Sequence, residues 1–246
     1  MLKGLRTLLF MICHFIVNTP GRIKYRVDNK ELDVEQKKLY TEKIYRIMQS
    51  FCRGMIKASG SELIVMGEEN LPSEPGNLYV SNHRGFYDPM AIAAVVNDPC
   101  IFIGKNGISK MPIIRTWFTA IGSIYITRED ARQALEVIKK GTEELKNHQS
   151  LVIYPEGTRS KTGELGEFKG GSFKLAFNSG ATIVPVAIKN TECIFENNKF
   201  PNMIKSAIVY VNIGKPISVQ DLSRAEQKAL PKKVEEYVQK LFNEIP

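Results

Sequence analysis

The stretch Leu78-Tyr-Val-Ser-Asn-His-Arg-Gly-Phe-Tyr-Asp-Pro89 passes from a short apolar run into a polar loop and then towards a helix. Residues 78–81 have the length and the apolar character of a buried strand. Asp88 followed by Pro89 has the pattern of a helix N-cap with proline at the first helical position. A strand, a tight polar loop and a helix in succession are typical of α/β proteins, in which strand ends border the binding crevice.

The same alternation continues along the chain from about Ser61. Helical patterns separate the apolar runs, so the order of elements is largely β-α-β and predicts an α/β sheet with helices covering both faces, in one domain over 61–246. At the end of the chain, Ser223 begins a Ser-x-x-Glu capping pattern, and Pro231 is expected to start a second helix. The expected strands are 62–66, 78–81, 100–103, 123–127, 151–154, 183–188 and 207–213, and the expected helices are 89–96, 130–147 and 171–178.

The composition excludes several classes of protein. The 246 residues are 43% apolar and 24% charged, which fits one folded domain of enzyme size. The 4 cysteines form no C-x-x-C pair and only 3 histidines are present, so neither a structural metal site nor a disulfide framework is expected. The net charge of +8 points to an anionic partner: a nucleic acid, a phosphorylated small molecule or the acidic cytoplasmic leaflet of a membrane.

The N-terminus contains a candidate membrane segment. Its apolar stretch from Leu8 to Val17 is interrupted by His14. As a helix it would be about 15 Å long, roughly half of the ~30 Å hydrocarbon core of a bilayer. Residues 17–19 make a poor signal-peptide cleavage site. We therefore expect an uncleaved, monotopic or peripheral anchor on the cytoplasmic face of the cell membrane.

A second amphipathic stretch runs from about Asp33 to Lys57. Lysines and arginines frame its apolar stripe, which leaves two interpretations open: a helix in the headgroup layer of an anionic membrane, or a helix packed on the domain core. We expect residues 1–60 together to form amphipathic, membrane-anchoring helices. The stripe consists of Tyr40, Ile44, Ile47, Met48, Phe51, Met55 and Ile56.

His83 and Asp88 are the candidate acid–base pair, in the loop between a predicted strand and a predicted helix. A carboxylate beside an imidazole fixes the tautomer of the histidine and makes it a better general base. The simpler alternatives are a helix cap for Asp88 and a loop histidine bonded to backbone for His83. His83 remains the best base available, because His14 lies in the apolar anchor and His148 in a polar turn.

A second polar loop, Tyr154-Pro-Glu-Gly-Thr-Arg-Ser160, follows another apolar run. The planar fork of Arg159 suits phosphate oxygens, and Gly157 lets the backbone approach a ligand closely. An internal pair between Glu156 and Arg159 in a surface turn is the simpler alternative. Downstream, residues 168–174 place two lysines and two glycines at an expected helix start, a setting that favours anions.

Lys105 and Arg128 each place a cation at the end of a predicted strand. Either one alone is readily explained as a solvated charge. Together with His83, Asp88 and the loop at 154–160, however, they fall at strand-to-loop junctions, which can converge on one edge of a sheet. Such convergence is how a phosphate-binding acid–base site is assembled.

Other functions lack their motifs. The chain has no G-x-S-x-G elbow, no G-x-x-x-x-G-K-[ST] phosphate loop and no G-x-G-x-x-G fingerprint. Because no helix-turn-helix, zinc-finger or RNP pattern accompanies the basic charge, a nucleic acid is not the expected partner. A non-catalytic lipid-binding module is the remote alternative to an enzyme.

Three ordered motifs resemble those of the glycerolipid acyltransferase family: Asn82-His83 with Asp88, Tyr154-Pro-Glu-Gly-Thr-Arg-Ser160, and Val184-Pro-Val-Ala-Ile188. The resemblance covers about residues 63–217 and is greatest to the members that acylate 1-acyl-sn-glycerol 3-phosphate. It implies that His83, oriented by Asp88, removes a proton from a glycerol hydroxyl, whose oxygen then attacks an acyl thioester.

The resemblance also implies the partners. The acyl donor would be acyl-CoA or acyl-acyl carrier protein, the acceptor would be lysophosphatidic acid, and no cofactor, metal or acyl-enzyme would take part. Arg159 would hold the phosphate of the acceptor. The substrate-binding positions that match the family motifs are Lys105, Arg128, Glu156, Gly157, Thr158 and Arg159.

The middle motif departs from the family pattern at two positions. Gly107 stands where an acidic residue is common, and Arg115 stands where a glycine after Pro112 is common. Since this motif touches the acceptor headgroup, other acceptors stay open: glycerol 3-phosphate, another lysophospholipid or a lyso-aminolipid.

Overall fold

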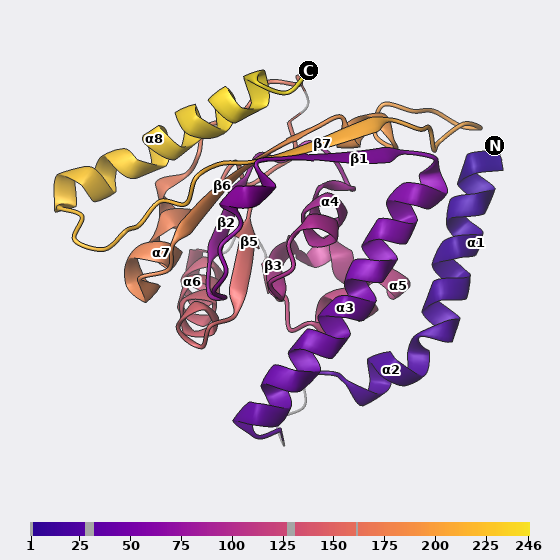
Figure 1. Cartoon of the computed structure of the whole chain (residues 1–246), viewed down its shortest axis with the longest axis horizontal. Coiled ribbons are helices and arrows are strands. Elements are labelled where there is room, and N and C mark those ends of the chain that lie inside the picture. Colours follow the sequence, from indigo (N-terminus) through magenta and orange to yellow (C-terminus); the bar gives the residue numbers. More distant parts are fainter. Residues whose placement is uncertain (1, 28–31, 127–130, 161) are drawn as a thin grey trace.

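The computed structural model describes residues 2–27, 32–126, 131–160 and 162–246, and its centre is the sheet seen in Figure 1. The described strands lie in the order β1-β7-β6-β2-β5-β3-β4. Strands β6, β2, β5, β3 and β4 are mutually parallel, whereas β7 pairs antiparallel with β6 and parallel with β1. The predicted α/β fold is confirmed. The strands are β1 (Glu62–Met66), β2 (Leu78–Ser81), β3 (Cys100–Lys105), β4 (Ile124–Ile126), β5 (Ser150–Ile153), β6 (Ile183–Lys189) and β7 (Ile208–Ile213).

Helices cover both faces of the sheet. Successive strand residues point to opposite faces, so Tyr79 belongs to a core beneath α3, α4 and α5, while Leu78 and Val80 belong to a core beneath α6, α7 and α8. Figure 1 shows α8 and α3 on opposite sides of the strands. The helices are α1 (Leu2–Val17), α2 (Thr19–Lys24), α3 (Val34–Ser59), α4 (Asp88–Val95), α5 (Pro112–Ala120), α6 (Ala131–Lys146), α7 (Lys174–Ser179) and α8 (Arg224–Asn243).

Helix α3 is part of the core. It begins at a capping box between Asp33 and Gln36 and ends at Gly60, whose φ of 83° is left-handed. The stripe predicted from helical spacing is largely buried against the sheet, with Ile44, Phe51 and other members less than a tenth exposed. Of the two interpretations of this segment, the structure shows core packing.

Helix α1 packs along α3 (Figure 1), and its exposed side chains are largely apolar. The helices meet closely at Gly54, where an added Cβ would lie 1.9 Å from Cζ of Phe10. Within the described ranges no helix is long and apolar enough to cross a membrane. Membrane anchoring by residues 1–60 stays a prediction. Its structural basis is the exposed apolar set Leu2, Leu5, Leu8, Leu9, Ile12, Ile16, Val17 and Ile23.

The C-terminal tail forms one helix, so the second helix expected at Pro231 is a wrong prediction. Helix α8 begins at the predicted capping box of Ser223 and Glu226 and continues through Pro231. Proline removes one backbone hydrogen bond and usually kinks or ends a helix. Here Leu230 and Val234 are buried on either side of it, and this packing keeps the helix continuous.

Candidate active site

His83 and Asp88 lie together at the carboxyl edge of the sheet. His83 follows the end of β2, and its Nδ1 is 2.7 Å from Oδ2 of Asp88. The Asp88 side chain is completely buried. Because the carboxylate accepts a hydrogen bond from Nδ1–H, the proton of the neutral imidazole stays on Nδ1 and Nε2 is unprotonated, which is the form a general base requires.

Asp88 is held by further donors. The backbone N–H groups of Arg84 and Gly85 donate to its Oδ2 at 2.5 and 2.8 Å, and the hydroxyl of Thr191 donates to Oδ1. Asp88 is the first residue of α4, and Tyr87 is the N-cap. The predicted N-cap role of Asp88 is therefore wrong: its carboxylate turns back to the preceding loop instead of capping its own helix.

Glu156 joins the base loop to its neighbours. Its Oε1 accepts from the backbone N–H of His83 at 2.6 Å, and its Oε2 accepts from that of Gly166 at 2.9 Å. Burial raises the pKa of Glu156, and these two donors oppose that rise. Both described partners are backbone groups, so the carboxylate positions the loops, whereas ligand contact at Glu156 stays a prediction.

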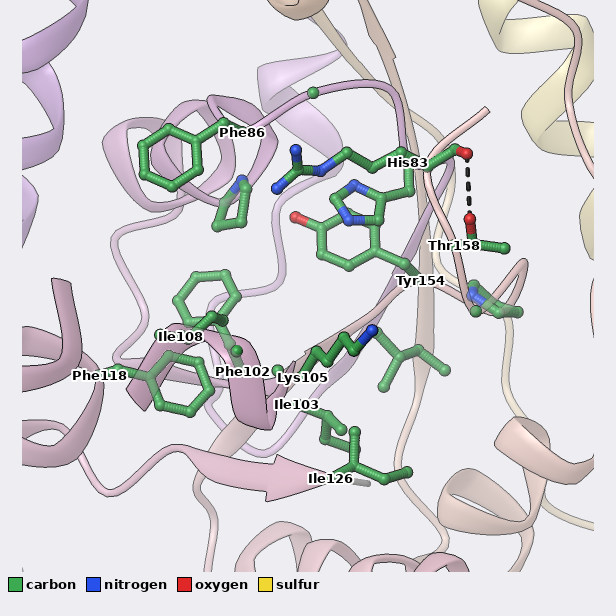
Figure 2. Close-up of a pocket in the computed structure, with 18 of the residues that line it drawn as sticks. His83, Phe86, Phe102, Ile103, Lys105, Ile108, Phe118, Ile126, Tyr154 and Thr158 are labelled. Carbon is green, nitrogen blue, oxygen red and sulfur yellow. Dashed lines mark hydrogen bonds between the residues drawn. The ribbon is translucent and has the colours of Figure 1, made fainter. Parts of the chain in front are cut away.

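Tyr154 supports the other side of the imidazole. Its ring stacks on His83 with centroids 4.3 Å apart and an interplanar angle of 19° (Figure 2). Thus Asp88 fixes the direction of the His83 ring, and Tyr154 fixes its plane.

Several lysine and arginine side chains line the cavity beside His83. Lys105, Arg159, Lys169 and Lys174 line it together with Gly157 and Thr158. Gly157 has φ of 73°, and a Cβ there would lie 3.2 Å from Nζ of Lys169, so this close approach favours glycine. The guanidinium of Arg159 donates to Oε1 of Glu196 at 2.9 Å at the exposed rim. Arg128 lies outside the described residues.

The whole cavity has a volume of about 1300 Å³, more than most small-molecule pockets, and it continues from His83 into an apolar interior. Figure 2 shows Phe102, Ile103, Ile108, Phe118 and Ile126 on the side away from His83, with Lys105 between the two regions. Helix α3 contributes Met48, Phe51 and Cys52 to the lining. The cavity therefore joins a cationic acid–base region to an apolar region.

Three polar residues of the site were missed in the sequence. Thr191 is fully buried and follows β6, so the strand-end rule that found His83 and Lys105 could also have found it. Arg84 donates to Glu192 at 3.0 Å and to the carbonyl oxygen of Gly163, which ties three loops together. For Glu192 and Arg84, no local motif signals a contact that spans 108 residues.

Several known proteins are similar to this chain in sequence. A 1-acyl-sn-glycerol-3-phosphate acyltransferase of Borreliella burgdorferi is 29% identical over 78% of this chain and 78% of its own length. The Saccharomyces cerevisiae protein of the same name is 31% identical over 76% of this chain and 61% of its own, and chloroplastic LPAT1 of Arabidopsis thaliana is 36% identical over 62% and 43%. The chain thus spans less than two thirds of the latter two relatives.

The fold matches a solved structure. The 1-acyl-sn-glycerophosphate (LPA) acyltransferase PlsC from Thermotoga maritima superposes with a TM-score of 0.75 over 99% of this chain and 97% of that one, at 24% identity. The family model for acyltransferases matches residues 62–189, which is more than half of the chain and contains the His83 and Glu156 loops. The chain belongs to the acyltransferase family.

Proposed function

We propose that the protein transfers an acyl chain from an acyl thioester, acyl-CoA or acyl-acyl carrier protein, to the sn-2 hydroxyl of 1-acyl-sn-glycerol 3-phosphate, giving phosphatidic acid. The observation that carries the proposal is the His83–Asp88 pair on a cavity that is cationic near the pair and apolar beyond it. The names of the relatives in Borreliella, yeast and Arabidopsis support the choice of acceptor.

His83 is the proposed general base. Its Nε2 takes the proton of the acceptor hydroxyl as the oxygen attacks the thioester carbonyl carbon. The tetrahedral intermediate then collapses, the C–S bond breaks, and the leaving thiolate takes the proton back from the imidazolium. Asp88 stabilises the imidazolium between these steps, and the transfer is direct because both substrates occupy one cavity.

The remaining residues divide between the two substrates. Arg159, Lys105 and Lys169 would bind the phosphate of the acceptor, and a phosphate at Arg159 would replace its contact with Glu196. The apolar interior would take an acyl chain. The exposed apolar face of α1 and α2 would hold the protein peripherally on the cytoplasmic surface of an anionic membrane, where a lysolipid resides.

Acyl transfer from palmitoyl-CoA, and in parallel from palmitoyl-acyl carrier protein, to 1-acyl-sn-glycerol 3-phosphate in detergent tests the proposal. We expect phosphatidic acid from the wild type and a loss of at least about 10²-fold in rate for His83→Ala. Circular dichroism of both proteins controls for folding. Near-normal turnover by His83→Ala would overturn the base assignment. If the wild type is folded but inactive, the acceptor is a different one. Glycerol 3-phosphate, other lysophospholipids and lyso-aminolipids would then be compared as acceptors by their kcat/KM.

The apolar half has its own test. Ile108 lines the interior, so Ile108→Trp should lower kcat/KM for a palmitoyl donor about 10- to 100-fold relative to an octanoyl donor, because the added ring occupies the space of the distal methylenes. Ile208→Trp, on the exposed start of β7, makes the same change outside the cavity and should leave the ratio unchanged. An unchanged ratio in Ile108→Trp would remove the acyl chain from this region.

Sidedness tests the proposed attachment. Protease should reach both ends of the chain from the same side of sealed vesicles. Ends protected on opposite sides would contradict a peripheral protein.

A further inference from the structure

A second, smaller cavity of about 190 Å³ lies between α2 and α5, apart from the catalytic one. Its described lining has three arginines and no carboxylate. The volume is below the ~300 Å³ typical of small-molecule pockets, so it suits a compact group. The lining residues are Arg22, Ile23, Arg26, Arg115, Thr116, Thr119 and Ala120.

Arg22 is built into this cavity. Only 8% of the residue is exposed. Its guanidinium lies 4.1 Å from the ring centroid of Phe15, and its Nη2 donates to the hydroxyl of Thr19 at 2.9 Å. Its Nε–H is buried and has no hydrogen-bond partner among the described residues. A buried donor without an acceptor is costly, and a bound acceptor would remove that cost.

The charges around Arg22 favour an anion. Burial, and then the positive charge of Arg26, lower the pKa of Arg22. Arg115 carries a third guanidinium on the exposed side of α5 and has no ion-pair partner within the described ranges. Arg115 is the residue that stands where the family commonly has glycine, and the structure places it in this second cavity and not in the catalytic one.

The cavity borders the apolar face of the N-terminal helices. Ile23 lines it and is 64% exposed, and Val17 at the end of α1 is 74% exposed. Apolar side chains with arginines at their edge match the boundary between acyl chains and phosphates in a lipid surface. This position makes a lipid phosphate one source of the ligand, and a soluble phosphate is the other.

We propose that Arg22 and Arg115, which line this cavity beside Arg26, form a binding site for a phosphate group, separate from the site of acyl transfer. The forked guanidinium of Arg115 gives two parallel donors to phosphate oxygens, and the Nε–H of Arg22 supplies a donor from the buried side.

The test compares Arg115→Gln with Arg224→Gln, which removes the same charge from an exposed position on α8, on the other side of the sheet. One arm measures binding to vesicles of phosphatidylcholine with and without phosphatidylglycerol. We expect Arg115→Gln to weaken binding to the anionic vesicles about five-fold more than Arg224→Gln does. Arg115→Lys, which keeps the charge but loses the fork, should fall between.

The second arm measures the rise in Tm with inorganic phosphate. Phosphate bound in the catalytic cavity should raise Tm equally in both variants. Any part of the rise in Tm that is lost in Arg115→Gln and kept in Arg224→Gln therefore measures phosphate binding at the second site. A selective loss with vesicles alone assigns the ligand to a lipid phosphate, and a selective loss with inorganic phosphate alone assigns it to a soluble one. Equal behaviour of Arg115→Gln and Arg224→Gln in both arms would overturn the proposal. Turnover of Arg115→Gln in detergent should stay at the wild-type level, which separates this result from failure of the proposed reaction.

Discussion

Two aspartates lie at opposite edges of the sheet: Asp88 is fully buried, and Asp98 is half-buried. Asp88 follows β2 at the carboxyl edge, where an imidazole, two backbone N–H groups and a hydroxyl donate to it. Asp98 precedes β3 at the amino edge, where the hydroxyl of Ser150 donates to Oδ2 and no described group donates to Oδ1. Burial raises the pKa of Asp98 to about 6.

Burial alone does not make a carboxylate functional. At Asp88 the donors surround a charge and fix its direction towards His83. The donor to Asp98, Ser150, is itself bound to the backbone, because its Oγ also accepts hydrogen bonds from the N–H groups of Gly76 and Asn77. One aspartate positions a base, and the other closes the start of a strand.

The largest effect is expected for Asp88→Asn. The amide cannot carry the charge that stabilises the imidazolium. Its NH₂ group would also face N–H or O–H groups that donate to Asp88 in the wild type, and it cannot accept from them. We expect kcat to fall about 10²- to 10⁴-fold, as when the carboxylate of a catalytic triad is replaced by an amide. Steady-state kinetics with Asp98→Asn as the matched control check this. A loss of less than about ten-fold would show that His83 needs no orienting carboxylate.

A smaller effect is expected at Thr191. Thr191→Val keeps the shape but leaves Oδ1 of Asp88 without its buried donor, so the aspartate is less fixed and kcat should fall about ten-fold, the equivalent of one hydrogen bond to a charged group. Thr191→Ser restores the hydroxyl and should recover most of the rate. Equal losses in both variants would mean that the side chain only fills space.

The smallest effect is a gain in stability at the other edge. Because the folded pKa of Asp98 is about 6, above its ordinary value, folding favours the protonated acid. Its contribution to stability is therefore present at low pH and is lost as the pH rises to about 6. Asp98→Asn should raise the free energy of unfolding at neutral pH by about 1–3 kcal/mol, with a smaller difference near pH 4. Urea unfolding of wild type and Asp98→Asn at neutral pH and near pH 4 measures this difference. A difference that does not change with pH would contradict the raised pKa of Asp98.

Much of the fold could be predicted from the sequence because apolar strands and polar loops alternate with little ambiguity. The predicted ranges of β1 and β2 agree with the structure at both ends, and parallel pairing explains why the loops after β2, β3 and β5 converge. The short helix α5, nine residues from Pro112 to Ala120, was not anticipated.

The site was predictable only where its residues share a short motif. His83 and Asp88 are five residues apart, and the loop from Gly157 to Arg159 is continuous. The apolar interior is lined by residues from α3, β3 and α5, which are far apart in the sequence. In the sequence alone, a side chain such as Phe118 cannot be distinguished from an ordinary core residue. The position of Thr191 after β6 marks it as a candidate, but its contact with Asp88 could not be predicted because the two residues are 103 positions apart.

That separation sets the order in which the protein can assemble during synthesis. The side chain of Asn82 exchanges two hydrogen bonds with the backbone of Ile188, and Thr191 reaches back to Asp88. The ribosome therefore releases the histidine loop long before the segment that holds Asn82 and Asp88, and closing so long a loop slows folding. A nascent chain that stops before β6 has His83, Asp88 and Tyr154 but lacks these later contacts, so we expect catalytic competence to arise late, when β6 inserts beside β2.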